Sequence, residues 1–188
     1  SGRAYVRRRS EVPVAAGSAQ PLLRPIADAR HVHGESGLGA ATLPPVRTGP
    51  VAGHAVDFLI EQIGVAPGEI TLVPTGPLTN IALAVRKEPR IVERVAEVVL
   101  MGGAYARGNR TPVSEFNIGC DPEAAQIVFR EPWPVTMVGL DLTHQALATP
   151  AVVARIAELG TAPARFVADL LEFFAGTYRT LQGFAAPP

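Results

Sequence analysis

Short apolar runs alternate with amphipathic stretches along most of the chain. The runs that predict strands are Ile70–Pro74, Glu97–Met101 and Pro134–Leu140, with a shorter candidate at Glu11–Ala15. Apolar positions at helical spacing lie within 54–64, from about Leu78 onward and within 121–129. Strands that alternate with helices in this way are typical of an α/β fold with a mostly parallel sheet and helices on both faces.

Start and stop signals refine these elements. Gly64 is expected to end the helix over 54–64, while Asp121-Pro122, Thr149-Pro150 and Thr161 each predict a helix start. The last helix carries an apolar stripe, which predicts packing against the core rather than a partner interface. The stripe consists of Phe166, Leu170, Phe173, Phe174, Tyr178 and Leu181.

The region between the first strand candidate and the first helix predicts a long loop. Gly and Pro punctuate residues 17–50, and the part at 31–39 has the glycine content of a flap that covers a site. We find no internal repeat and no low-complexity tract along the chain. The length and the absence of repeats predict one domain over residues 1–188.

Charge and composition exclude several classes of partner. Seventeen Lys and Arg residues balance seventeen Asp and Glu residues, so no global field attracts a nucleic acid. No apolar run approaches the roughly 18 residues of a membrane span, and the first residues do not resemble a signal peptide. We therefore expect no membrane and no nucleic-acid partner, and a cytoplasmic location. Cys120 is the only cysteine, which excludes an intramolecular disulfide and favours a packing role.

The segment over 99–129 is the most informative for function. An apolar strand runs into a glycine turn, and a loop with Asn109, Glu115 and Asn117 follows before the next helix. A carboxylate accepts hydrogen bonds, whereas a carboxamide both donates and accepts them, so this set suits the vicinal hydroxyls of a sugar. Thr75 ends the preceding strand, at the sheet edge where open α/β folds bind ligands. The sequence therefore predicts a small, polar, hydroxylated ligand.

Other kinds of chemistry fit the sequence less well. Gly103 and Gly108 have the spacing of a phosphate-binding loop, but Asn109-Arg110 follows where a Lys and a Ser or Thr are needed. No Gly-x-Gly-x-x-Gly motif follows a strand, and no Gly-x-Ser-x-Gly elbow occurs. Asp141 closes a predicted strand just before His144. It has two interpretations, orienting a catalytic histidine or satisfying neighbouring backbone groups.

Five segments together resemble one family. They are HVHGESGLG at 31–39, TGPLTN at 75–80, MGGA at 101–104, GNRTPVSEFNI at 108–118 and DPEAA at 121–125. Their order and spacing are similar to those of the nucleoside hydrolases, the inosine-uridine preferring N-ribosyl hydrolases. The resemblance implies a Rossmann-like α/β fold and hydrolysis of the N-glycosidic bond of ribonucleosides to ribose and free base. It also implies a tightly bound calcium ion and homo-oligomers.

The resemblance also implies roles for individual residues. The residues that it assigns to the substrate are Asn109, Glu115, Asn117, Met101 and His33. The first three would hydrogen-bond the ribose hydroxyls, and the methionine would pack beside the sugar. The histidine lies in the flap and would contact the base, the alternative being a solvated loop histidine. Thr75 would bind calcium through its backbone carbonyl, as suits a cation that takes oxygen ligands.

Two parts of the family pattern have no counterpart in the sequence. The family opens with an Asp-x-Asp-x-Gly-x-Asp-Asp cluster that supplies most calcium ligands and the general base, and a His-Asp pair follows a segment similar to 178–184. The resemblance thus implies a hydrolase domain incomplete at both ends. The chain would lack the family's first strand and its catalytic residues, and we expect it to be inactive with weak or absent calcium binding. The alternatives are a noncatalytic nucleoside- or ribose-binding protein and a nonfunctional truncated product.

Overall fold

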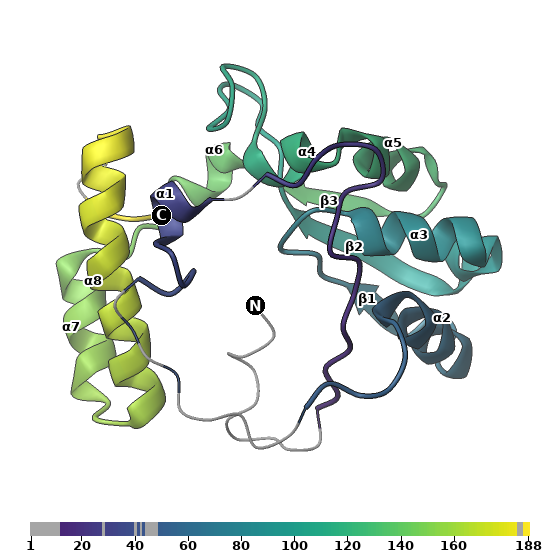
Figure 1. The fold of residues 1–188 in the computed structure, drawn as a ribbon, viewed down its shortest axis with the longest axis horizontal. Coiled ribbons are helices and arrows are strands. Elements are labelled where there is room, and N and C mark those ends of the chain that lie inside the picture. The colour runs from purple at the N-terminus through teal and green to yellow at the C-terminus, as the bar shows by residue number, and fades with distance from the viewer. Residues whose placement is uncertain (1–11, 28, 40, 42, 44–48, 184–185) are drawn as a thin grey trace. The chain divides into compact units, whose positions relative to one another are not determined.

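The computed structural model describes residues 12–27, 29–39, 41, 43, 49–183 and 186–188. These residues form two compact units (Figure 1). The sheet unit lies within 11–27 and 49–142, and the helical unit lies within 28–48 and 143–188. Both units are described separately below, and the expected single domain over 1–188 stays a prediction.

A parallel three-stranded sheet forms the centre of the sheet unit among the described residues. Its order is β1 (Ile70–Leu72), β2 (Val95–Met101) and β3 (Val135–Val138). Leu72 pairs with Val98, and Val98 pairs with Val135, so β2 is central. The three longer strand predictions and the predicted α/β class are confirmed.

The strand candidate at Glu11–Ala15 is wrong over its described part. Glu11 lies outside the described residues, and residues 12–15 form no strand. Ala16 alone forms an isolated parallel bridge with His54, and the Val51 N–H donates to the Val14 carbonyl at 2.8 Å. The apolar alternation at 12–15 therefore supports local backbone pairing without a ladder.

Several helices accompany the sheet. They are α2 (Ala55–Val65), α3 (Thr79–Lys87), the 3-10 helix η1 (Pro89–Arg94), α4 (Phe116–Cys120), α5 (Pro122–Arg130) and α6 (Leu140–Thr143). The Asp121 side chain accepts a hydrogen bond from the Ala124 N–H at 3.1 Å, which caps α5 as its sequence predicted. Helix α2 continues through Gly64 and ends one residue later, so this glycine does not stop it.

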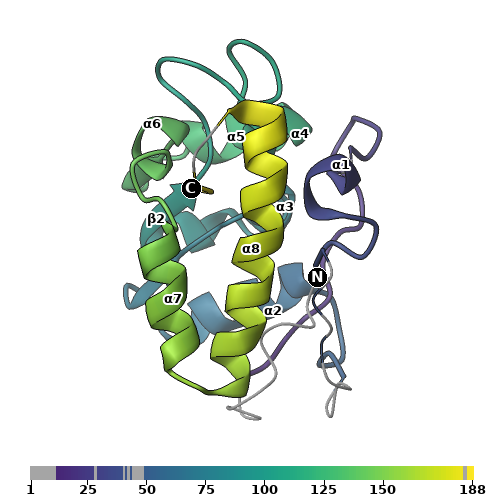
Figure 2. The same cartoon turned by 90° about the vertical axis from the view of Figure 1, so that its left-hand side faces the viewer.

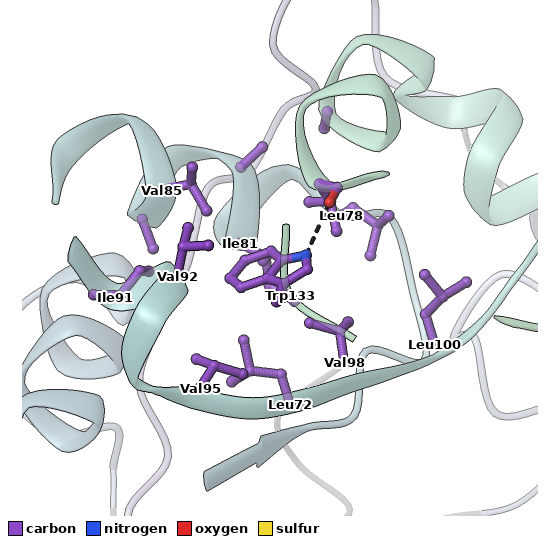
Figure 3. Close-up of a cluster of buried hydrophobic side chains, with 14 of the residues drawn as sticks. Leu72, Leu78, Ile81, Val85, Ile91, Val92, Val95, Val98, Leu100 and Trp133 are labelled. Carbon is purple, nitrogen blue, oxygen red and sulfur yellow. Dashed lines mark hydrogen bonds between the residues drawn. The ribbon is translucent and has the colours of Figure 1, made fainter. Parts of the chain in front are cut away.

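The core lies between one face of the sheet and these helices. Figure 3 shows Leu72, Val98 and Leu100 pointing from the strands toward the side chains of α3, η1 and Trp133. The Trp133 indole N–H donates to the Val128 carbonyl at 2.9 Å, which satisfies the one polar group of this buried ring. On the opposite face Val73 is 63% exposed. Side chains alternate between the two faces of a strand, so β2 presents Val99 and Met101 on the less buried side.

The helical unit contains α1 (Arg30–His33), α7 (Pro150–Glu158) and α8 (Ala162–Gln182). Helices α7 and α8 lie side by side (Figure 2), and Thr149 and Thr161 cap their first turns as predicted. A side chain at Gly39 would overlap the Phe173 ring, with its Cβ 2.4 Å from the nearest ring atom. This contact and a φ of +58° require glycine there.

The predicted packing of the apolar stripe of α8 against the core stays a prediction, since the two units are described separately. Within the helical unit the described side chains of the stripe are half-buried. Phe174 packs against the His33 ring of α1, and further contacts join α8 to α7. Periodicity identified an apolar side of the helix, but it could not specify what that side contacts.

Within the described residues, no helix is both long enough and apolar enough to cross a membrane.

Leu100→Ala tests the assigned core. Leu100 is 1% exposed in the central strand, so its truncation should lower the free energy of unfolding by about 2–5 kcal/mol. Denaturant unfolding followed by the fluorescence of Trp133, the only tryptophan, measures the change. Val65→Ala is the control, because Val65 is 77% exposed and its truncation should change stability by less than about 0.5 kcal/mol. Equal effects of the two substitutions would contradict the assigned core.

Candidate functional site

The candidate site lies where β1, β2 and β3 end. The Met101 N–H donates to the Pro74 carbonyl at 2.9 Å, and the Gly102 N–H donates to the Val138 carbonyl at 3.1 Å. These bonds hold the carboxyl ends of neighbouring parallel strands together, as expected for a ligand-binding edge of an open α/β sheet. Thr75 and Met101, which are distant in sequence, therefore meet.

Asn117 connects these two strand ends. Its side-chain nitrogen Nδ2 lies 3.0 Å from the Met101 carbonyl oxygen and 3.5 Å from the Thr75 carbonyl oxygen. The same nitrogen lies 3.3 Å from the Met101 sulfur. Asn117 is half-buried, whereas Thr75 is exposed. The structure thus brings together three of the residues that the sequence assigned to the site.

Glu115 is almost fully buried, with 2% exposure, and its carboxylate accepts three backbone hydrogen bonds. Oε1 accepts from the Asn117 N–H at 2.8 Å, and Oε2 accepts from the N–H groups of Ile118 at 3.1 Å and Gly103 at 3.0 Å. The side chain caps α4 and at the same time anchors the glycine turn after β2. Its predicted contact with a ribose hydroxyl stays a prediction, while its architectural role is visible.

Asn109 closes the loop that precedes α4. Its Oδ1 accepts a hydrogen bond from the Phe116 N–H at 2.9 Å, and the side chain lies on the surface. Inside the loop the Gly108 N–H donates to the Pro112 carbonyl at 3.0 Å. A Cβ at Gly108 would lie 2.3 Å from the Ser114 carbonyl oxygen, so only glycine fits there. The loop holds Asn109 at a defined position beside the start of α4.

Cys120 has the packing role that the sequence predicted. The residue is buried at the end of α4, and burial raises the pKa of its thiol. Arg110 lies across this region, with its guanidinium 3.4 Å from the sulfur and 5.5 Å from the centre of the Phe116 ring. These contacts hold the loop against α4.

Asp141 anchors the beginning of the same loop. Its carboxylate accepts hydrogen bonds from the N–H groups of Tyr105 at 2.6 Å and Ala106 at 3.1 Å. Of the two interpretations left by the sequence, the satisfaction of neighbouring backbone groups is thus seen directly. Spacing along the sequence could not identify these donors, because they lie more than thirty residues away.

His33 belongs to the helical unit, where its ring packs edge-on against Phe174 with ring centres 5.1 Å apart. The side chain is half-buried, so the alternative of a fully solvated loop histidine does not describe it. A contact between His33 and the base stays a prediction.

The described residues do not fit a calcium ion. No group of three or more His, Cys, Asp or Glu side chains among them is arranged to hold a metal. The Thr75 carbonyl offers one neutral oxygen, whereas calcium takes about six to eight oxygen ligands. The carboxylates of Glu115 and Asp141 already accept backbone hydrogen bonds. The role of Thr75 as a metal ligand remains a prediction, and the oxygen ligands among the described residues do not by themselves support it.

Comparison with known proteins identifies similar sequences and folds. Residues 3–188 match the family described as inosine-uridine preferring nucleoside hydrolase. The chain is 59% identical over 169 residues to the inosine-uridine preferring nucleoside hydrolase of Leishmania major, covering 89% of this chain and 54% of that protein. It is 44% identical to a pyrimidine-specific ribonucleoside hydrolase of Shigella flexneri, covering 94% of this chain and 56% of that protein.

A solved structure shows the same fold. The purine-preferring ribonucleoside hydrolase from Gardnerella vaginalis superposes with a TM-score of 0.89 at 35% identity. The match covers 95% of this chain and 58% of that one. The chain therefore spans somewhat more than half the length of the relatives that it matches.

Glu115→Gln tests the architectural role of this carboxylate. The substitution places an NH₂ group against backbone N–H donors, so we expect a loss of about 1–3 kcal/mol in the free energy of unfolding. Trp133 fluorescence in a denaturant titration measures the loss. Glu93→Gln is the control, because Glu93 is exposed and the same change there should cost little. A Glu115→Gln chain as stable as the unsubstituted one would refute the anchor.

Proposed function

Because the chain belongs to the inosine-uridine preferring nucleoside hydrolase family, we propose that the protein hydrolyses the N-glycosidic bond of ribonucleosides and that this chain binds the ribose. The relatives described above carry names that differ in base preference but share the ribonucleoside. The part common to these substrates includes the ribose. Similarity to these relatives therefore supports ribose recognition and assigns no base preference.

The arrangement around Asn117 is the observation that carries this proposal. Carbonyl oxygens from two strand ends and one carboxamide converge at the carboxyl edge of the sheet. A sugar hydroxyl both donates and accepts, so it can donate to the carbonyl of Thr75, an exposed residue, and exchange hydrogen bonds with Asn117. Asn109 supplies a further carboxamide on the adjoining loop, and Met101 offers an apolar surface beside the sugar.

The proposed reaction cleaves one bond and forms another at the same carbon. The bond from C1′ to the base nitrogen breaks, the oxygen of water bonds to C1′, and a proton passes to the departing base. Positive charge develops on the ribosyl group in an oxocarbenium-like transition state. Backbone carbonyls near the sugar present the negative ends of their dipoles and can stabilise that charge. We assign binding and orientation to this chain, and we assign it no catalytic residue.

Further features of the whole protein follow from the family resemblance as proposals. They are calcium-dependent activity, homo-oligomers, a cytoplasmic location and a role in purine and pyrimidine salvage. For this chain alone we propose weak or absent calcium binding, since the described donors do not complete a coordination sphere.

Asn117→Ala should abolish ribose binding. The substitution removes the group that meets the carbonyls of both strand ends. Isothermal titration with ribose and with inosine measures the loss. Gln126→Ala removes an exposed carboxamide from α5 and should leave the affinity unchanged. Unchanged affinity in the Asn117→Ala chain would remove Asn117 from the site.

The same titrations with and without calcium separate the interpretations of the chain. Metal-dependent binding supports a hydrolase chain, and metal-independent binding supports a noncatalytic ribose-binding protein. Absence of binding under both conditions supports a product without function of its own.

The 188-residue chain should not cleave inosine or uridine, with calcium or without it. The described residues contain no cluster of acidic or histidine side chains suited to a metal, and we assign them no general base. Release of reducing sugar measures cleavage, and the hydrolase of Leishmania major serves as the positive control. Turnover by this chain that disappears in the Asn117→Ala variant would show that the expectation of inactivity is wrong.

A further inference from the structure

Asp121 is a fully buried carboxylate whose two oxygens have different partners. Oδ1 accepts from the Ala124 N–H at 3.1 Å, which is the ordinary cap of α5. Oδ2 accepts from the Thr79 hydroxyl at 2.6 Å and from the Leu22 N–H at 2.9 Å. Helix capping thus explains the hydrogen bond of Oδ1. The hydrogen bonds of Oδ2 connect the start of α5 to Thr79 in α3 and to Leu22.

This second oxygen connects the two segments that carry the candidate site. Thr79 is four residues after Thr75, and it begins α3. Asp121 is four residues after Asn117, and it is the C-cap residue that follows α4. A short hydrogen bond between Thr79 and Asp121 therefore ties the turn after β1 to the helix after β2.

The distance between Thr75 and Asn117 is sensitive to this tie. The Thr75 carbonyl lies 3.5 Å from Asn117 Nδ2, at the outer limit of a hydrogen bond, whereas the Met101 carbonyl lies at 3.0 Å. The ladder holds Pro74 through the Met101 N–H, and beyond the turn that follows, Leu78 is buried in the core and Thr79 bonds to Asp121. A shift of a few tenths of an ångström in that turn would separate Thr75 from Asn117.

A second hydrogen bond, made by the next residue of α3, holds the same end of the turn. Asn80 Oδ1 accepts from the Ser18 N–H at 2.8 Å, so the segment that contains Leu22 is also tied to the next residue of α3. A Cβ at Gly17 would lie 2.6 Å from Asn80 Oδ1, which shows how closely the two segments pack. The segment over 18–22 is therefore held at two residues, Ser18 by Asn80 and Leu22 by Asp121.

We propose that Thr79 and Asp121 are positioning residues that set the distance between the Thr75 carbonyl and the Asn117 carboxamide. Neither side chain needs to touch a ligand, since each acts through the backbone segment that it holds. The expected effect on ribose affinity rests on the function proposed above. The effect on the distance between Thr75 and Asn117 does not depend on that function.

Thr79→Val and Thr79→Ser form the test pair. Valine matches the shape of threonine without its hydroxyl, and serine retains the hydroxyl. Nuclear magnetic resonance of the side-chain NH₂ group of Asn117 reports its hydrogen bonds, and the indole N–H signal of Trp133 reports the fold. Thr79→Val should move the NH₂ signals and speed their exchange with water about tenfold, while the Trp133 signal stays. Thr79→Ser should restore both properties of the unsubstituted chain.

Thr149→Val is the matched control, because it removes a helix-capping threonine hydroxyl from the helical unit. It should leave the Asn117 signals unchanged. If Thr79→Val does not give a folded spectrum, Thr79→Ala replaces it, since alanine also removes the hydroxyl that bonds to Asp121.

Ribose titration of the same variants separates the two proposals. We expect Thr79→Val to weaken ribose binding about tenfold or more and Thr79→Ser to retain it. An unsubstituted chain that binds no ribose would refute the proposed function, and the Asn117 signals would still decide the positioning role. Asn117 signals that are identical in the unsubstituted and Thr79→Val chains, or a Thr79→Ser chain that changes as much as Thr79→Val, would overturn the positioning role.

Discussion

Parallel pairing of β1, β2 and β3 is the constraint on which the rest of this region depends. It brings three carboxyl strand ends to one edge, and the bonds of Met101 to Pro74 and of Gly102 to Val138 hold them there. Past each strand end, the chain turns away and its backbone N–H groups lose their ladder partners. Buried polar groups must be satisfied, so this edge needs acceptors from elsewhere in the chain.

Past β2, carboxylates supply acceptors for the N–H groups of Gly103, Tyr105 and Ala106. Glu115 receives three backbone N–H groups, Asp141 receives two, and Asp121 receives two together with a threonine hydroxyl. Each of these carboxylates therefore contributes to the shape of the edge. The carbonyls and carboxamides of Thr75, Met101 and Asn117 form the set that the proposed ribose would meet. The predicted contact of Glu115 with a ribose hydroxyl stays a prediction beside this role in holding the backbone.

Burial in the sheet unit is uneven between the two faces. The face with Val98 and Leu100 packs against helices, while the opposite face carries the exposed Val73. The chain also spans only somewhat more than half the length of its relatives. The proposal for this chain is therefore limited to binding and orientation of the sugar.

The sequence by itself determined the strands, most helix starts, the family and the segment that carries the candidate site. These features depend on local patterns: apolar periodicity, capping residues such as Asp121 and Thr161, and glycines at tight turns. Only the tertiary structure decided that Glu115 anchors a turn, that Thr79 meets Asp121, and that the stripe of α8 packs within the helical unit. Hydrogen bonds and packing contacts form between segments that are far apart along the chain, and their partners are set by how the strands and helices come together rather than by any local spacing.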